Sequence, residues 1–365
     1  MADIRNVPGP RTGDRFTVGV SRDFLDSEGN NVWGDIRLGE LDAAPGVDWH
    51  YLPRDTDELL AADVDGLDAV LFAGPAVTER TFAGATRPPL LFARFGVGYD
   101  AVDLNACTRH GALVTITPDG ARRPVATATL ALLLAVLHNL PAKDRLVRTG
   151  RWAEKEQWMG LGLTGRRVGL IGLGNTARDL VGLLRPFEID VVAYDPYCPQ
   201  DVARGLGVRL ADADTVVAEA DAVIVMCALT EETRHFVDAR RLALMKPSAV
   251  LLNVARGPIV DEAALIEALR CRRIRGAGLD VFESEPPDPG NPLLGMDQVV
   301  LSPHALAWTD EMSAGNGGSA VRAVLDVSQG RVPPFVVNRE ATEEPGLVRR
   351  LAAWAARSGT VGVHA

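Results

Sequence analysis

The stretch "RRVGLIGLGNTARDLVGLLRPF", from Arg166 to Phe187, decides the fold. Its apolar run "RVGLIG" leads directly into a G-x-G-x-x-A pattern made by Gly172, Gly174 and Ala177, and then into a helical pattern. The first glycine permits a tight turn, the second lets a pyrophosphate approach the backbone, and the small third residue lets helix and strand pack closely. We therefore expect a strand, a phosphate loop and a helix N-terminus that attracts phosphate, with a glycine turn that binds no ligand as the alternative.

The next predicted strand, "DVVAYD", indicates which dinucleotide the loop would bind. It ends in Asp195, which is 195 − 174 = 21 residues past the second glycine. A carboxylate at this place accepts hydrogen bonds from the ribose hydroxyls of NAD and repels the 2′-phosphate of NADP. NAD is therefore favoured over NADP, and an exposed acid without a ligand is the other reading of Asp195. We also assign Asn175, Thr176, Cys227 and Ala255 to the cofactor site.

Short apolar runs recur along the chain and alternate with helical patterns, as in "FTVGV", "AVLFA" and "LLFARF" before residue 100 and "AVIVM", "AVLLNV" and "GAGLDV" after residue 220. This alternation predicts an α/β fold with two Rossmann-like parallel-sheet domains and an active-site cleft between them. "TPDGARRP", Thr117 to Pro124, has the proline, glycine and charges of a crossing, before a helix at about 125–140. Another helix at about 310–329 and "GRVPPFVVN" return the chain to the first domain. The predicted boundaries are 15–117 for the substrate domain, 118–304 for the NAD-binding domain, 305–340 for the return, and 1–14 and 341–365 for terminal extensions.

Composition excludes several classes of partner. The chain has 365 residues, 47% of them apolar, and a formal net charge of −10, which suits a soluble protein and gives no general attraction for nucleic acid or anionic lipid. The longest apolar run, residues 130–137, is too short to span a bilayer. Cysteine falls singly, which argues against a metal cage or disulfides and fits a cytoplasmic protein. We expect a small-molecule partner and no metal.

Four polar side chains follow predicted strands, at the edge where α/β sheets bind ligands. They are Arg256 after "AVLLNVA", Asp280 and Glu285 in "AGLDVFESEPP", and His304 in "VVLSPHALAW". Each has an ordinary structural explanation, such as a salt bridge, a cap or a satisfied loop histidine. Together, an arginine can hold a carboxylate by two hydrogen bonds, and a histidine oriented by a glutamate can pass a proton to a carbonyl oxygen. Beside a nicotinamide, this set is suited to reducing a 2-oxo acid.

At these residues the chain resembles the D-isomer-specific 2-hydroxyacid dehydrogenases, over roughly residues 18–338. The matching segments are "FGVGYDAVDLNACTRHGALV", "VGLIGLGNTA", "LTEETRHFVDARRLALMKPSAVLLNVARGPIVDEAALIEAL", "GAGLDVFESEPP" and "SPH". The resemblance implies a homodimer in which Arg256 binds and polarises the substrate, Glu285 pairs with the general acid/base His304, and Asp280 contacts the nicotinamide amide. It also implies that backbone amides near Val97 and Gly98, in "GVGYD", hold the substrate carboxylate.

Several departures from the family pattern concern the substrate. Ala73 and Gly74 stand where phosphoglycerate dehydrogenases carry an arginine and a serine, and formate dehydrogenases pair their histidine with glutamine where this chain has Glu285. Trp308 narrows the pocket or packs under the following helix. Glyoxylate, hydroxypyruvate and larger 2-oxo acids all stay open as substrates. A scaffold or corepressor that binds NAD(H) on the same fold is the competing function, because fold alone does not fix function.

Overall fold

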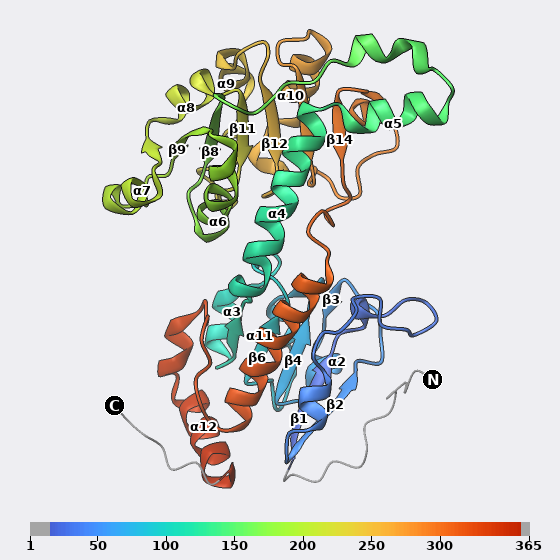
Figure 1. Cartoon of the computed structure of the whole chain (residues 1–365). Helices are drawn as coiled ribbons and strands as arrows, with labels where there is room; N and C mark the ends of the chain where they lie inside the picture. Colours follow the sequence, from blue (N-terminus) through green and yellow to red (C-terminus); the bar gives the residue numbers. More distant parts are fainter. Residues whose placement is uncertain (1–14, 359–365) are drawn as a thin grey trace. The chain divides into compact units, whose positions relative to one another are not determined.

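The computed structural model of the chain describes residues 15–358. Within these residues the chain forms two compact units, one made of residues 15–121 and 309–358 and the other of residues 122–308 (Figure 1). The predicted boundaries 117/118 and 304/305 lie close to these divisions. The predicted extension 1–14 and residues 359–365 of the predicted tail fall outside the described residues. Parallel strands alternate with helices in both units, so the predicted α/β fold with two parallel-sheet domains is confirmed.

Unit 1 contains a five-stranded parallel sheet in the order β2-β1-β4-β6-β7. The strands are β1 (Phe16–Val20), β2 (Val47–Tyr51), β4 (Ala69–Phe72), β6 (Leu91–Arg94) and β7 (Leu113–Thr115), and β3 (Glu58–Leu59) pairs separately with β5 (Ala76–Val77). Its helices are α1 (Gly39–Asp42), α2 (Ala61–Val64), α3 (Leu104–Arg109), α11 (Asp310–Ser328) and α12 (Pro345–Ser358), with 3-10 turns η1 (Arg22–Phe24), η2 (Glu79–Thr81) and η7 (Arg339–Glu343). The helix predicted near 310–329 is confirmed as α11, which packs on β4 and β6.

The C-terminal part of unit 1 is built into its core. The ring of Trp354, in α12, lies 5.1 Å from the ring of Phe16 in an edge-to-face contact, and Leu347 and Leu351 are buried in the same cluster. The side chain of Asn338 accepts a hydrogen bond from the backbone of Val114 and donates one to Ala112. The chain therefore comes back to the first sheet after residue 309 and covers one face of it.

Unit 2 contains a seven-stranded parallel sheet in the order β10-β9-β8-β11-β12-β13-β14. The strands are β8 (Arg167–Ile171), β9 (Asp190–Tyr194), β10 (Arg209–Leu210), β11 (Ala222–Val225), β12 (Val250–Asn253), β13 (Gly276–Leu279) and β14 (Val299–Leu301). The helices are α4 (Pro118–Leu137), α5 (Leu140–Arg148), α6 (Asn175–Leu184), α7 (Gln200–Leu206), α8 (Ala213–Glu219), α9 (Ala239–Leu244) and α10 (Glu262–Arg270), with 3-10 turns η3 (Trp152–Trp158), η4 (Arg185–Phe187), η5 (Gly257–Ile259) and η6 (Pro292–Gly295).

Two apolar layers hold this second sheet. Ile224 and Leu252 are buried in one cluster with α4 and α6, whereas Val223 and Leu251 are buried in another with α8, α9 and α10. Successive residues of a strand point to opposite faces, so runs that are apolar throughout bury both faces of the sheet. Strand order reverses at β8 and β11, because β9 and β10 extend to one side of β8 and β12 to β14 to the other. Such a reversal opens the crevice where α/β sheets bind ligands.

The helix α4 begins earlier than predicted. The segment "TPDGARRP" was expected to be a crossing before a helix at about 125–140, but the helix starts at Pro118, continues through Pro124 and ends at Leu137. Proline is tolerated in the first turn of a helix, and the loss of one hydrogen bond at Pro124 does not end α4 here. Among the described helices, α4 alone is long and apolar enough to cross a membrane by length and composition, and half of its most apolar window is buried inside the protein. Core helices of globular proteins meet the same criterion.

Candidate active site

The glycine loop lies at the point where the strand order of unit 2 reverses. It connects β8 to α6, and Gly172 has a φ of +96°, which disfavours any side chain. A Cβ atom there would lie 2.8 Å from the Cα of Cys227, at the end of the neighbouring β11. At Gly174, by contrast, a Cβ would have no protein atom within 4 Å. The loop therefore packs tightly against the sheet at Gly172, whereas the space next to the Cα of Gly174 is free for a ligand.

The start of α6 can receive an anion. Gly174 is the N-cap, Asn175 and Thr176 form the first turn, and Ala177 is buried at the contact with the sheet. Within residues 15–358, no side chain caps this helix, so the first N–H groups keep their partial positive charge. Space at Gly174 and an uncapped helix are what a bound pyrophosphate requires.

Asp195 follows β9, and its side chain is hydrogen-bonded to the glycine loop. Its carboxylate accepts a hydrogen bond from the backbone N–H of Leu173 at 2.7 Å and another from Tyr197 at 2.9 Å. This contact fixes the loop to the end of β9, which the sequence alone did not predict. The side chain is half-buried, so its oxygens can accept further hydrogen bonds. The predicted contact of Asp195 with a ribose stays a prediction.

Cys227 and Ala255 follow β11 and β12 at the same edge of the sheet. Burial raises the pKa of the Cys227 thiol to about 11, so the sulfur is protonated near neutral pH and behaves as a small apolar group. The N–H of Ala255 donates to the buried side chain of Asn253 at 3.1 Å, and the amide of that side chain donates to the carbonyl of Arg256 at 2.9 Å. Asn253 therefore shapes the loop that carries Arg256, a role that the sequence analysis missed. The sequence signal for this role was Asn253 itself, a polar residue at the end of the otherwise apolar strand β12.

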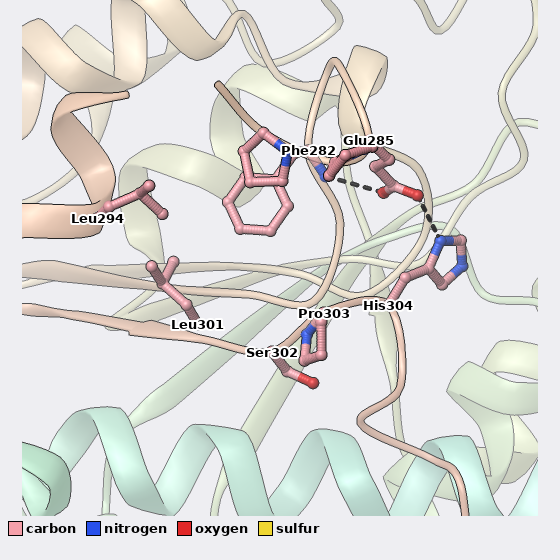
Figure 2. A pocket seen from close by; sticks show the side chains of 9 residues that line it. Phe282, Glu285, Leu294, Leu301, Ser302, Pro303 and His304 are labelled. Carbon is pink, nitrogen blue, oxygen red and sulfur yellow. Dashed lines mark hydrogen bonds and ion pairs between the residues drawn. The ribbon is translucent and has the colours of Figure 1, made fainter. Parts of the chain in front are cut away.

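His304 and Glu285 form a pair at the carboxyl ends of β13 and β14 (Figure 2). Nδ1 of His304 lies 2.7 Å from Oε2 of Glu285, and Oε1 of Glu285 accepts the N–H of Phe282 at 3.0 Å. Because an ionised carboxylate can only accept, Nδ1 carries a proton in this bond and Nε2 is the nitrogen left for other chemistry. The structure thus brings together two residues that the sequence predicted to pair.

The electrostatics of Glu285 favour its charged form. Burial opposes the charge, but hydrogen bonds from His304 and Phe282 and the positive charge of Arg256 together hold the pKa of Glu285 below its usual range. Arg256 follows β12, and its Nη1 donates to the carbonyl of Ala255 at 2.7 Å. The guanidinium therefore acts electrostatically on the same carboxylate that orients His304.

Asp280 holds the loop on which His304 lies. Its Oδ1 accepts the N–H groups of Ala305 and Leu306, both at 3.0 Å, and its carbonyl accepts the N–H of His304 at 2.8 Å. These bonds fix His304 in a left-handed conformation with a φ of +52°, which is uncommon for a residue with a side chain. Burial raises the pKa of Asp280 despite these donors. The predicted contact of Asp280 with a nicotinamide amide stays a prediction.

An apolar cavity of about 400 Å³ lies beside the His304–Glu285 pair, within the size range of small-molecule sites. Its walls come from the turn after β13, from η6 and from the end of β14, namely Phe282, Pro286, Pro287, Leu294, Leu301, Ser302 and Pro303. Figure 2 shows Leu294 and Leu301 on one side of the site and His304 on the other. The acid/base candidate is therefore partly enclosed by apolar groups.

The predicted substrate loop belongs to unit 1. Val97 and Gly98 follow β6, and the side chain of Val97 is 43% exposed. The loop is fixed at Gly96, whose N–H donates to Oγ1 of Thr117 at 2.8 Å and whose carbonyl accepts the N–H of Thr117 at 2.9 Å. The hydroxyl of Thr117 donates in turn to Asn316 of α11. Thr117 thus anchors this loop, and the role of Val97 and Gly98 toward a substrate stays a prediction.

Comparison with known proteins connects this geometry to a family. The family model described as D-isomer specific 2-hydroxyacid dehydrogenase, NAD binding domain, matches residues 130–305. The glyoxylate reductase of Thermofilum pendens is 36% identical over 294 residues, covering 79% of this chain and 83% of that protein. The D-3-phosphoglycerate dehydrogenase of Methanocaldococcus jannaschii is 35% identical over 302 residues, which are 82% of this chain but only 56% of that longer protein.

A solved structure agrees with the fold. The NADPH-dependent glyoxylate/hydroxypyruvate reductase of Sinorhizobium meliloti, in complex with citrate, superposes with a TM-score of 0.74 at 30% identity, covering 89% of this chain and 98% of that one. The resemblance predicted from the sequence is confirmed, and unit 2 contains the family's NAD-binding domain. The chain belongs to the D-isomer-specific 2-hydroxyacid dehydrogenase family.

Proposed function

We propose that the protein interconverts a 2-oxo acid and a D-2-hydroxy acid with NAD as the hydride carrier. One observation carries this proposal: His304, hydrogen-bonded to Glu285, follows the edge strand β14 of the same sheet in which the inner strand β8 leads into the glycine loop. An acid/base group and a dinucleotide loop on one sheet edge suit the reduction of a carbonyl.

The residues present fit a bound dinucleotide. The open space at Gly174 and the uncapped start of α6 fit a pyrophosphate, and the carboxylate of Asp195 fits ribose hydroxyls. Because a negative charge at Asp195 would repel a 2′-phosphate, we propose NAD rather than NADP, although the reductase of Sinorhizobium meliloti is NADPH-dependent. When bound, NADH supplies the hydride that reduces the carbonyl carbon.

The protein's own groups handle the proton and the charge. In reduction, His304 gives a proton from Nε2 to the carbonyl oxygen, and in oxidation neutral His304 takes it back. Glu285 fixes the orientation of the ring through its bond to Nδ1. Arg256 holds the substrate and stabilises the negative charge that develops on the oxygen, and backbone amides at Val97 and Gly98 hold the substrate carboxylate.

Turnover of NADH with glyoxylate, hydroxypyruvate and larger 2-oxo acids, followed by chiral analysis of the product, tests the proposal. We expect consumption of NADH and a D-2-hydroxy acid. An L product, or bound NADH with no turnover on any of these acids, would count against it, and the second result would favour a protein that only binds the cofactor.

We also propose that the enzyme is a cytoplasmic homodimer. The segment that contains α5 and η3 exposes four large apolar side chains, at 59%, 60%, 64% and 81%, for Leu140, Val147, Trp152 and Met159. Apolar groups gathered in one segment favour association with a second copy. Light scattering at micromolar concentration is expected to give twice the 39.0 kDa mass of the chain, and a monomer mass would overturn this assignment.

A further inference from the structure

A second histidine–glutamate pair lies next to the candidate active site. His235, on the loop before α9, is bonded through Nε2 to Oε1 of Glu283, which is two residues before Glu285. The backbone N–H of the same residue donates to the carbonyl of Pro258 at 2.8 Å, two residues after Arg256. His235 thus contacts both segments that carry the polar groups acting on His304.

These two segments are in direct contact. A Cβ atom at Gly257 would lie 1.7 Å from the carbonyl oxygen of Phe282 and 2.5 Å from the nitrogen of Glu283. The backbone beside Arg256 therefore rests on the backbone that begins the turn to Glu285. Because neither segment has room to yield toward the other, a shift of one displaces the other.

The backbone holds His235 firmly. Its φ of +49° is left-handed, and such outliers persist where the surroundings fix them. Val237 donates to the carbonyl of Ile259, and Asp261 donates to Val237, both at 3.1 Å, so the loop runs beside η5 as a short parallel bridge. On the other side, the N–H of Glu283 donates to Oε2 of Glu262 in α10 at 3.1 Å.

The exposure of the pair argues against a purely stabilising role. The side chains of His235 and Glu283 are 46% and 34% exposed, and ion pairs in such settings contribute little to stability. Their placement matters more, because small displacements of groups that position a reaction reduce its rate strongly.

We propose that His235 is a positioning residue, which fixes the Arg256 loop and the Glu285 turn relative to each other through Glu283. This inference rests on the proposed function of Arg256, Glu285 and His304.

The variant His235→Asn tests it, because asparagine tolerates the left-handed backbone while the imidazole is lost. The matched control is His110→Asn, since His110 forms a similar pair with Glu79 in unit 1, with Nε2 3.1 Å from Oε1. For reduction of glyoxylate we expect kcat to fall about tenfold in His235→Asn, with a larger isotope effect from deuterated NADH and unchanged NADH affinity and melting temperature. The control keeps its kcat. Combining His235→Asn with Glu283→Ala is expected to cost little more than either change alone, because both break one contact.

A second readout is independent of turnover. We expect the proton on Nδ1 of His304 to give a downfield NMR resonance that is lost in His304→Gln. This resonance should shift or broaden in His235→Asn and stay in place in His110→Asn. An unmoved resonance with unchanged kcat would overturn the positioning role. If the wild-type protein reduces no 2-oxo acid, the proposed function fails, and the resonance still decides whether His235 positions the Glu285–His304 pair.

Discussion

The described residues include three histidine–glutamate pairs, and two of them lie in clearly different settings. In unit 2, His304 pairs with Glu285 at 2.7 Å, and in unit 1, His110 pairs with Glu79 at 3.1 Å. In both pairs the pKa of the glutamate is held below its usual range, and in both the side chains are about one-third to three-fifths exposed. Neither pairing nor exposure therefore separates a candidate acid/base histidine from a structural one.

The surroundings do separate them. His110 ends α3, lies flat on the ring of Phe82 at a centroid distance of 4.4 Å, and shares Glu79 with Arg109, whose Nη2 donates to that carboxylate at 2.5 Å. His304 follows a strand at the ligand-binding edge of a sheet, lines a cavity and is held by backbone bonds to Asp280. The comparison teaches that a histidine becomes a candidate acid/base through its place in the fold.

Replacing His304 and His110 one at a time should give the largest difference in reaction rate between the two settings. His304→Gln removes the proton donor, and we expect reduction of a 2-oxo acid to slow by about 10²- to 10⁴-fold, with NADH affinity unchanged. His110→Gln should leave the rate within twofold of the wild type. Steady-state kinetics and fluorescence titration with NADH measure both effects. Equal losses in the two variants would remove the distinction between the pairs.

The arginines beside the two pairs give the next largest contrast. Arg256→Gln is expected to lower kcat/KM for the 2-oxo acid by roughly 10², since two charge-assisted hydrogen bonds to substrate are lost. Arg109→Gln removes the corresponding cation beside Glu79 and should leave kcat/KM unchanged. A result in which Arg256→Gln affects only the melting temperature would make that arginine structural.

The pH dependence of the reaction sharpens the comparison further. Because the pKa of Glu285 lies below its ordinary value of 4.5, the carboxylate stays charged and keeps orienting His304 until the pH falls below about 4.5. Reduction takes up a proton through His304 and oxidation releases one, so the reduction rate should fall and the oxidation rate should rise as the pH increases above about 6. Rates measured in both directions, with hydride transfer rate-limiting, check this. A reduction rate that is flat from about pH 6 to 9 contradicts it.

The smallest expected effect concerns cofactor choice. Asp195→Ser removes the carboxylate that would contact the ribose. We expect the ratio of kcat/KM with NADH to kcat/KM with NADPH to fall by roughly tenfold, which corresponds to the loss of about one charge-assisted hydrogen bond. A small loss of melting temperature should accompany it, because Asp195 also holds the N–H of Leu173. Asp190→Ser, at the other end of β9, is the matched control. An unchanged ratio would show that Asp195 does not distinguish the ribose of NADH from the phosphorylated ribose of NADPH.

What the sequence could predict was local. The glycine loop, the strands that precede Arg256 and His304, and the helix α11 each have their signals within a few neighbouring residues. The pairing of Glu285 with His304 came from resemblance to a family, because a separation of 19 positions gives no spacing that fixes a contact.

What the sequence could not predict depends on contacts between distant segments. Nothing near Gly257 shows that Phe282 packs against it, and nothing near Asp195 shows that it will hold Leu173. The early start of α4 was missed for another reason, because proline is read as a helix breaker. The first turn of a helix accepts Pro118, and Pro124 inside α4 costs one hydrogen bond without ending the helix.

The most direct test of the central claim is oxidation of NADH by a series of 2-oxo acids, measured for the wild type, His304→Gln and His110→Gln. The account predicts turnover by the wild type, its loss in His304→Gln and its retention in His110→Gln. Turnover that survives in His304→Gln, with NADH bound equally by all three proteins, would contradict the assignment of His304 as the acid/base of this enzyme.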